Sequence, residues 1–225
     1  RTVSPTVTGA ATVGQTLTVS SAAWTPAATM TYYWLCDGKF LGEQVSDDVF
    51  EQATGLTYVL KPGDVGCKIT VLARAEAVNA NVAITVVMSG ATATVAQASF
   101  AVSPVPTVSG VLAVGEELTA VTGNWSAVPD SFTYQWKRAG VSIAGAVEST
   151  YVLTDADLGK AMTVTVTAVR AGFVSMSMTS VASTGVARAF DFVDQPSISG
   201  VAQVGRTLTA SFETWSPVPT TIAYQ

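Results

Sequence analysis

The sequence contains no histidine, and charged residues make up only 12% of it. Without histidine, the chain cannot form Ser–His or Cys–His nucleophilic pairs, and it lacks the commonest zinc ligand and general base. The net charge is −5 and no lysine or arginine cluster is present, whereas nucleic-acid binding requires several cations on one face. These absences argue against catalysis, against a cofactor or metal, and against a nucleic-acid partner.

Long apolar runs are also missing. The most apolar stretch, Val82 to Met88, has the length of a strand, whereas a membrane-spanning helix needs about 18 apolar residues. We therefore expect no membrane span. The sequence opens at Arg1 without a start methionine or a signal peptide, which is typical of a mature or excised segment.

The sequence does contain one unit written three times. Each copy opens with a proline (Pro5, Pro106 and Pro196), and a tryptophan follows 19 residues later in every copy. A Val-Gly pair and a Leu-Thr pair lie between them, and the first two copies continue to Tyr32–Trp34 and Tyr134–Trp136. A fixed internal period indicates that one structural unit recurs along the chain.

Thr, Ser, Ala and Val are abundant, and an all-β fold is predicted because such residues suit half-buried pleated surfaces. Alternation with a period of two marks the inward faces of the expected strands. In the first copy these residues are Tyr32, Trp34, Cys36, Ile69, Val71 and Ala73; in the second they are Tyr134, Trp136, Met162, Val164 and Val166. The Asp37-Gly38 pair predicts a hairpin turn between two strands.

The motifs of each copy resemble a known family. Taken together, the copies read Pro-x-Val-x-Gly (with Ile for Val in the third), Val-Gly-x-x-Leu-Thr and Trp-Ser-Pro (Trp-Thr-Pro in the first, Trp-Ser-Ala in the second), and the first two continue to Tyr-x-Trp and, at a later corner, Asp-x-Gly. This order is similar to the tandem immunoglobulin-like repeats of bacterial secreted and cell-surface proteins. The resemblance implies tandem immunoglobulin-like β-sandwiches, two complete and one truncated, and an extracellular location. The implied domains are residues 1–98, residues 99–188 with the preceding linker, and residues 189–225, an incomplete third domain.

The two cysteines, Cys36 and Cys67, are predicted to form a disulfide. Cys36 shares the parity of Trp34, and Cys67 shares that of Ile69, so both point inward on strands that are neighbours in an immunoglobulin-like sheet. The second copy has a basic residue at each place, so the cysteines occur together and are missing together. A disulfide also implies an oxidising, extracytoplasmic location.

Carboxylates are the remaining candidates for chemistry. Asp155 and Asp157 lie at the corner after the Tyr151 strand, and Asp64 matches Asp157 in the first copy. One hypothesis is a Ca²⁺ site or an acid–base pair. The other is structural, because such corners use side chains that hydrogen-bond backbone N–H groups. We favour the structural hypothesis, since the first copy has Pro62 where a second acid would be needed.

The copies differ mainly in one insertion. Trp34 and Tyr58 are 24 residues apart, whereas Trp136 and Tyr151 are 15 apart. Long loops on rigid scaffolds often carry binding sites, and the alternative is a longer hairpin with a solvated acidic tip. The candidate binding residues in this loop are Phe40, Glu43, Asp47, Asp48, Phe50 and Glu51.

Aromatic residues recur at fixed places. Trp24, Trp125 and Trp215 could form a sugar-stacking platform, but their recurrence favours packing, so we predict them, with Trp34 and Trp136, as core residues of the repeat.

Residues 99–105 and 189–195 join the copies and carry Phe100 and Phe190, each six residues before a proline. They lack a Gly/Ser tract, so short, fairly stiff linkers are expected.

The third copy breaks off early. Gln225 matches Gln135, so the sequence stops just before the expected tryptophan and leaves Ile198, Leu208 and Phe212 as an apolar face. We expect the natural chain to continue. The alternative is that strands from another chain complete the unit, as in strand-addition assembly.

The function expected from these features is structural: a stalk, a rod or the building block of a surface fibre. The expected partners are neighbouring repeats of the same chain and, in a fibre, identical subunits. One alternative is an adhesin that binds through the loop from Phe40 to Gln52. Another is an accessory β module of a secreted hydrolase.

Overall fold

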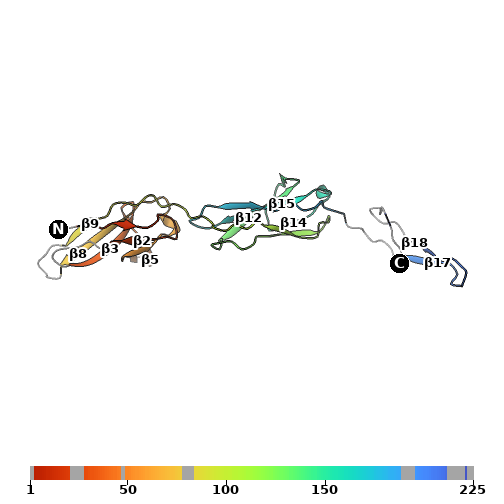
Figure 1. Cartoon of the computed structure of the whole chain (residues 1–225), viewed down its shortest axis with the longest axis horizontal. Coiled ribbons are helices and arrows are strands. Elements are labelled where there is room, and N and C mark those ends of the chain that lie inside the picture. Colours follow the sequence, from red (N-terminus) through yellow and green to blue (C-terminus); the bar gives the residue numbers. More distant parts are fainter. Residues whose placement is uncertain are drawn as a thin grey trace. The chain divides into compact units, whose positions relative to one another are not determined.

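The computed structural model describes residues 3–20, 28–46, 49–77, 84–188, 196–211 and 221, and only the backbone of residues 44–46, 49–50 and 77 (Figure 1). Within these residues the fold is all-β: strands form antiparallel sheets, and the two helices are single 3₁₀ turns at Pro62–Asp64 and Asp155–Asp157. No helix in the described ranges has the length and apolar character needed to cross a membrane.

The first copy contains two main sheets and a hairpin. The three-stranded sheet has the order β1-β2-β7, the four-stranded sheet has the order β4-β3-β8-β9, and β5 pairs with β6. The strands are β1 (Val7–Thr8), β2 (Thr16–Val19), β3 (Ala28–Cys36), β4 (Lys39–Phe40), β5 (Gly42–Ser46), β6 (Val49–Gln52), β7 (Thr57–Val59), β8 (Ile69–Ala77) and β9 (Thr85–Met88).

The second copy repeats this order without the hairpin. Its sheets have the orders β10-β11-β14 and β13-β12-β15-β16. The strands are β10 (Thr107–Gly110), β11 (Glu117–Val121), β12 (Ser131–Arg138), β13 (Val141–Ser142), β14 (Thr150–Val152), β15 (Met162–Val169) and β16 (Met176–Thr179).

In the first copy, the predicted turn at Asp37-Gly38 is present between β3 and β4. Both residues have positive φ (45° and 83°), as a tight hairpin requires.

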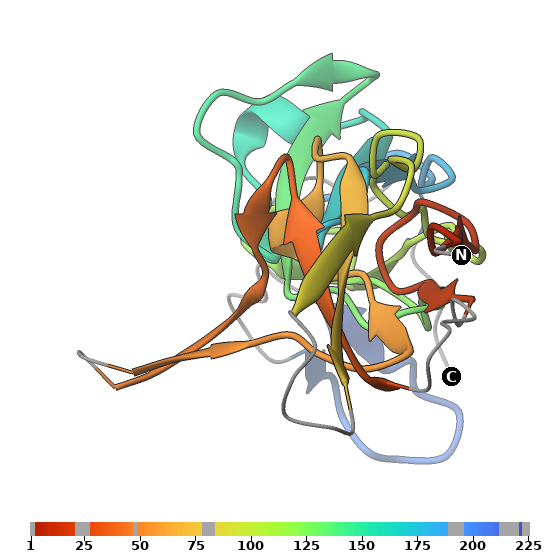
Figure 2. The ribbon, with the colours of Figure 1, turned by 90° about the vertical axis from the view of Figure 1, so that its left-hand side faces the viewer.

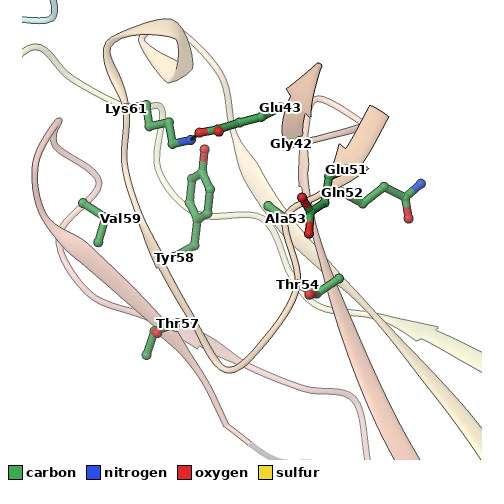
Figure 3. A pocket seen from close by; sticks show the side chains of 10 residues that line it. All are labelled: Gly42, Glu43, Glu51, Gln52, Ala53, Thr54, Thr57, Tyr58, Val59 and Lys61. Carbon is green, nitrogen blue, oxygen red and sulfur yellow. Dashed lines mark hydrogen bonds and ion pairs between the residues drawn. The ribbon is translucent and has the colours of Figure 1, made fainter. Parts of the chain in front are cut away.

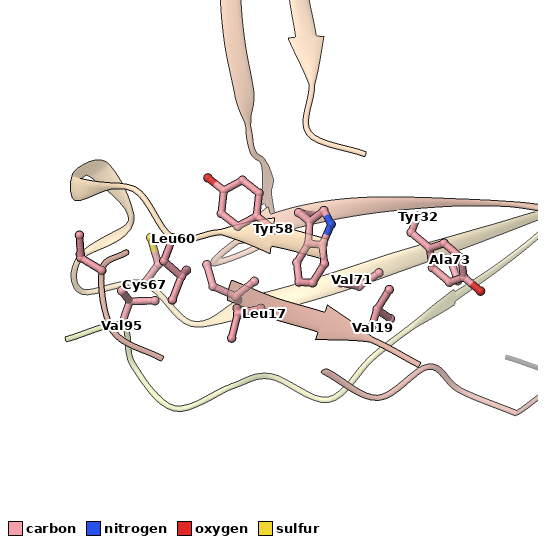
Figure 4. Packing of buried hydrophobic residues seen from close by; sticks show 12 residues of the cluster. Leu17, Val19, Tyr32, Tyr58, Leu60, Cys67, Val71, Ala73 and Val95 are labelled. Carbon is pink, nitrogen blue, oxygen red and sulfur yellow. The ribbon is translucent and has the colours of Figure 1, made fainter. Parts of the chain in front are cut away.

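The core of the first copy lies between its two sheets (Figure 4). Leu17 and Val19 of β2 and Tyr58 of β7 face Trp34 of β3 and Val71 of β8. The Trp34 and Tyr58 rings stack with centroids 5.7 Å apart. The predicted inward residues of the strand from Ile69 to Ala73 are all buried.

The core of the second copy follows the same plan. Leu118, Trp136 and Met162 are fully buried, as are Val164 and Val166, and the Trp136 ring stacks on Tyr151 at 5.9 Å. β15 alternates buried and half-buried residues along its whole length, because one face of the strand covers the core and the other lies toward solvent. The period-two pattern therefore predicted the correct faces.

The described part of the third copy is one strand pair, β17 (Ser197–Ser199) with β18 (Thr209–Ser211). Gly200 has φ 125°, and a Cβ there would lie 2.7 Å from the Thr207 carbonyl; Gly110 has nearly the same geometry. The backbone therefore repeats the earlier copies, but Leu208 is 51% exposed, whereas Leu118 is 0% exposed. Ile198 is also exposed, and Phe212 lies outside the described residues.

The chain divides into two compact units. The first consists of Arg1–Ser103, Asn124–Phe132 and Ala168–Met176, and the second of Pro104–Gly123, Thr133–Thr167 and Ser177–Gln225. Two short segments that follow Pro106 in the sequence thus belong to the first unit. The domain boundaries at residues 98 and 188 stay a prediction.

Candidate functional site

The insertion of the first copy forms a hairpin of β5 and β6 that projects from the rest of its unit (Figure 2). An open groove of about 370 Å³ lies where the hairpin meets the strand β7 (Figure 3). The residues that line the groove are Gly42, Glu43, Glu51, Gln52, Ala53, Thr54, Thr57, Tyr58, Val59 and Lys61. The hairpin and β7 together build this candidate binding site.

Charges lie at one end of the groove. Lys61 and Glu43 form an exposed ion pair, which Figure 3 shows above the hydroxyl end of Tyr58. The hydrogen bond from Lys61 lowers the pKa of Glu43 below its ordinary value. Glu51 also lines the groove and is exposed. The rim therefore carries two carboxylates and one ammonium group.

Tyr58 links the groove to the buried corner below it. Its hydroxyl donates to the Asp64 carboxylate at 3.0 Å, and the Lys61 amide donates to the same carboxylate oxygen at 2.7 Å. Burial and the nearby Asp64 charge raise the pKa of the Tyr58 phenol. Tyr58 therefore stays protonated at physiological pH and acts as a hydrogen-bond donor.

The backbone of β7 offers a second kind of contact. The Val19 amide donates to the Leu56 carbonyl, and the Leu60 amide donates to the Gln15 carbonyl. The intervening pair, Leu17 with Tyr58, must then be hydrogen-bonded as well, because such pairs alternate along antiparallel strands. The N–H and C=O groups of the residues on either side of Tyr58 consequently point away from β2, toward the groove.

The second copy has a groove at the same place, beside β14. Its volume is about 390 Å³. It is lined by Ile143, Ala144, Gly145, Ala146, Val147, Glu148, Thr150, Tyr151 and Val152. The strand wall, Thr-Tyr-Val, is the same in both copies. In the first copy the opposite wall carries Glu43 and Glu51, and Lys61 follows the strand, whereas the only charged residue among the described ones that line the second groove is Glu148. The insertion thus gives one copy a distinct chemical surface.

The candidate binding residues predicted from the sequence are not all gathered at the groove. Glu43 and Glu51 line it, whereas Phe40 lies on β4 with its ring against Tyr33, 5.9 Å between centroids. Phe50 belongs to β6, and only its backbone is described. Asp47 and Asp48 lie outside the described residues.

A second group of residues connects the third strand of each copy to the corner that follows it. Cys36 and Cys67 form the predicted disulfide, with Cα atoms 5.4 Å apart. In the second copy Arg138 stands at the place of Cys36, and its Nε donates to Asp157 at 2.5 Å. The end of the third strand is therefore tied to the following corner in both copies, once by a covalent bond and once by an ion pair.

Asp157 is the centre of the second tie. It is 0% exposed and accepts hydrogen bonds from the Thr154 amide (2.7 Å), the Thr154 hydroxyl (2.8 Å) and the Tyr151 hydroxyl (3.1 Å) besides Arg138. Burial alone would raise the pKa of Asp157, but these bonds outweigh it and leave the pKa below its ordinary value. The pKa of Arg138 is raised, chiefly by its hydrogen bond to Asp157.

The corner acids thus have structural partners. Asp64 and Asp157 each accept a backbone N–H, as the structural hypothesis requires, and Asp155 pairs with Arg188 at 2.6 Å. Within the described residues, one group of potential metal ligands is close enough to share an ion: Cys36, Asp37 and Cys67. Its sulfurs are joined in the disulfide, so they offer no thiolate to a metal.

The tryptophans fall into two classes. Trp34 and Trp136 are fully buried in the two cores, whereas Trp125 is half-buried and contacts Phe100 and Phe132 in the first unit. Trp24 and Trp215 lie outside the described residues. Sequence reasoning thus grouped Trp125 with the core, although its ring neighbours are Phe100 of the linker and Phe132 at the start of β12.

Two features escaped the sequence analysis. The stack of Trp34 on Tyr58 recurs as Trp136 on Tyr151, and each tyrosine stands six residues before its aspartate. This repeated spacing could have predicted the hydrogen bond between the tyrosine and the aspartate in each copy. The role of Arg138 had no signal, because its ion pair occurs in one copy only.

The comparisons with known proteins give no independent support for a family. No protein-family model matches the chain, and no curated protein matches it significantly.

Proposed function

We propose that the chain is a non-catalytic structural segment of an extracellular bacterial surface protein, built of tandem immunoglobulin-like sandwiches that serve as a stalk, a rod or a fibre unit. The observation that carries the proposal is the strand order. In each copy the second strand lies beside the strand with the Thr-Tyr-Val sequence, and the third strand lies beside the long strand after the corner. Immunoglobulin-like sandwiches pair strands B with E and C with F in this way.

The ties at the corner also favour a load-bearing role. Both copies join the end of the third strand to the following corner, although the chemistry differs. The same two parts of the sandwich are thus joined in both copies, by a disulfide in one and by an ion pair in the other. Such a repeated connection suits a unit that must resist being pulled apart. The disulfide fits an oxidising, extracytoplasmic location.

The proposed absence of catalysis rests on the lack of histidine and on the corner acids. Asp64 and Asp157 are buried and engaged by backbone amides, so they are poorly placed to exchange protons with a substrate. Screens with esters, peptides and polysaccharides are expected to show no turnover. Turnover that Asp155→Ala or Asp48→Ala abolishes would contradict the proposal.

A display experiment tests the structural role. The chain is placed between a cell-surface anchor and a reporter, and a second version carries a further copy of residues 99–188. We expect both versions to present the reporter, and the longer version to present it farther from the cell. Loss of display with the longer version, or an unchanged height, would contradict a spacer function.

The groove beside β7 favours one alternative, an adhesin. The groove combines outward-facing backbone groups with Glu43, Glu51 and Lys61 on its rim, which suits an extended peptide that adds a strand at this edge. A version in which a two-residue turn replaces residues 43–51 tests this. Binding to a panel of immobilised surface proteins and glycans that disappears in this version would favour the adhesin.

The other alternative, an accessory module of a secreted hydrolase, depends on flanking sequence. It would be favoured if the full-length protein carries a catalytic domain whose activity on insoluble substrate falls when residues 1–188 are removed.

A further inference from the structure

Residues 97–103 overlap the segment 99–105, which the sequence suggests is a short stiff linker, and their backbone is hydrogen-bonded within the first unit at Ala98 and Val102. The Ala98 amide donates to the Gly172 carbonyl at 2.9 Å, and the Val174 amide donates to the Ala98 carbonyl at 2.8 Å. Farther along, the Val102 amide donates to the Ser126 hydroxyl at 2.7 Å, and the Ser126 amide donates back to Val102 at 3.1 Å. The segment is therefore held at two points, against the loop around Gly172 and against the loop around Ser126.

An aromatic ring anchors the middle of this segment. Phe100 is only 5% exposed, and its ring lies 5.3 Å from Trp125 in an edge-to-face contact and 5.2 Å from Phe173. Two further residues hold the anchor in place: Phe132 lies 6.0 Å from Trp125, and the Arg170 guanidinium lies 5.0 Å over the Phe173 ring. Such ring pairs contribute beyond their buried area.

A close approach of backbone completes the arrangement. A Cβ at Gly172 would meet Val13 at 2.9 Å and Pro62 at 3.0 Å, and Gly172 has φ 75°. Pro62 belongs to the 3₁₀ turn of the first copy and Val13 to its core. Only glycine fits this position, so the loop that receives residue 98 also lies against the corner of the first copy.

We infer that Phe100 and its slot, formed by Trp125 and Phe173, act as a lock that holds residues 97–103 and couples the local stability of three segments: residues 97–103, 124–132 and 168–176. Removal of the Phe100 ring lets these three segments open together, while the buried sheets stay folded. Local cooperative opening of this kind is a general property of structured segments with few anchoring contacts. The inference goes beyond the proposed function and does not depend on it.

Amide hydrogen exchange on the full chain tests the lock. In Phe100→Ala we expect exchange at the amides of Ala98, Val102 and Val174 to accelerate at least about tenfold, because their hydrogen bonds open with the lock. Amides of β8 and β15 should keep the rates of the parent chain. Phe40→Ala is the matched control, since it removes a ring that is 43% exposed and should leave all these rates unchanged.

Two outcomes would overturn the inference. Unchanged exchange rates at Ala98 and Val174 in Phe100→Ala would show that the ring does not stabilise the hydrogen bonds of these residues. Equal acceleration throughout the chain would show that Phe100 contributes only to global stability. If Phe100→Ala fails to fold, Phe100→Leu decides: it keeps an apolar side chain but loses the ring contacts, and the same amides must still accelerate selectively.

Discussion

Removing Arg138 tests the idea that an ion pair in the second copy replaces the disulfide of the first. In Arg138→Met, the carboxylate of Asp157 stays fully buried but loses the cation 2.5 Å away. Breaking a buried pair by removing one partner typically costs about 3–5 kcal/mol. The Arg138 side chain is 29% exposed, and Asp157 keeps its bonds from Thr154 and Tyr151, so we expect about 2–3 kcal/mol, below that range.

A double variant sharpens this test. Arg138 and Lys160 stand at the places of Cys36 and Cys67, so Arg138→Cys with Lys160→Cys rebuilds the tie of the first copy. A disulfide that closes a loop of this length contributes about 3 kcal/mol in the chain-entropy model. The oxidised double variant should therefore recover most of the stability that Arg138→Met loses.

The assay must report on each copy separately. Urea dependence of amide exchange, followed by mass spectrometry of peptides from residues 150–167 and 57–73, gives a free energy of unfolding for each. Arg188→Met is the matched control, because its partner Asp155 is largely exposed and such pairs contribute less than about 1 kcal/mol. The reasoning is refuted if Arg138→Met costs no more than Arg188→Met, or if the double variant forms no disulfide.

Three further predictions concern the same structure. Reduction of the Cys36–Cys67 bond should lower the free energy of unfolding of the first copy by about 3–4 kcal/mol and leave the second copy unchanged, as seen by exchange with and without a reductant; equal effects on both copies would contradict this. Hydrogen bonds lower the pKa of Asp157 in the folded state, so its contribution is present above the unfolded pKa of about 3.9 and is lost as pH falls through the lowered pKa. A urea series between neutral and acidic pH should show this loss in the parent chain and a weaker dependence in Asp157→Asn. Gly172→Ala should destabilise the first unit by more than about 2 kcal/mol, since it combines positive φ with a steric clash. Gly145→Ala, with φ 76° and open space around its Cβ, should cost only about 1 kcal/mol; similar thermal midpoints for the two variants would contradict the steric argument.

The sequence predicted much of the fold because its pattern is repeated. The alternation of Ile69, Val71 and Ala73, and of Met162, Val164 and Val166, gave the correct buried faces. The parity of Cys36 and Cys67 gave the disulfide. Each of these features is local and periodic, so one-dimensional reasoning captures it.

The misplaced or missed features depend on contacts between distant segments. Trp125 recurs like a core residue, but its ring meets Phe100 and Phe132 in the first unit. The spacing of Phe100 before the next proline was visible, whereas its slot required a loop more than 70 residues away at Phe173. Arg138 reaches Asp157 only because strand and corner are adjacent in space.

The candidate site was predicted in outline only. The length difference between the copies located the insertion, and Glu43 and Glu51 do line the groove. The groove itself could not be predicted, because its other wall is β7, which carries the same Thr-Tyr-Val sequence in both copies and therefore gave no distinguishing signal.

The load-bearing role is tested most directly by stretching single chains of residues 1–225 from their two ends. The account predicts a discrete unfolding event for each complete copy under oxidising conditions. Reduction should lengthen the event of the first copy by about 110 Å, because the disulfide spans 31 residues and an extended chain covers about 3.5 Å per residue. Extension without discrete events, or an event whose length is the same with and without reductant, would contradict the account.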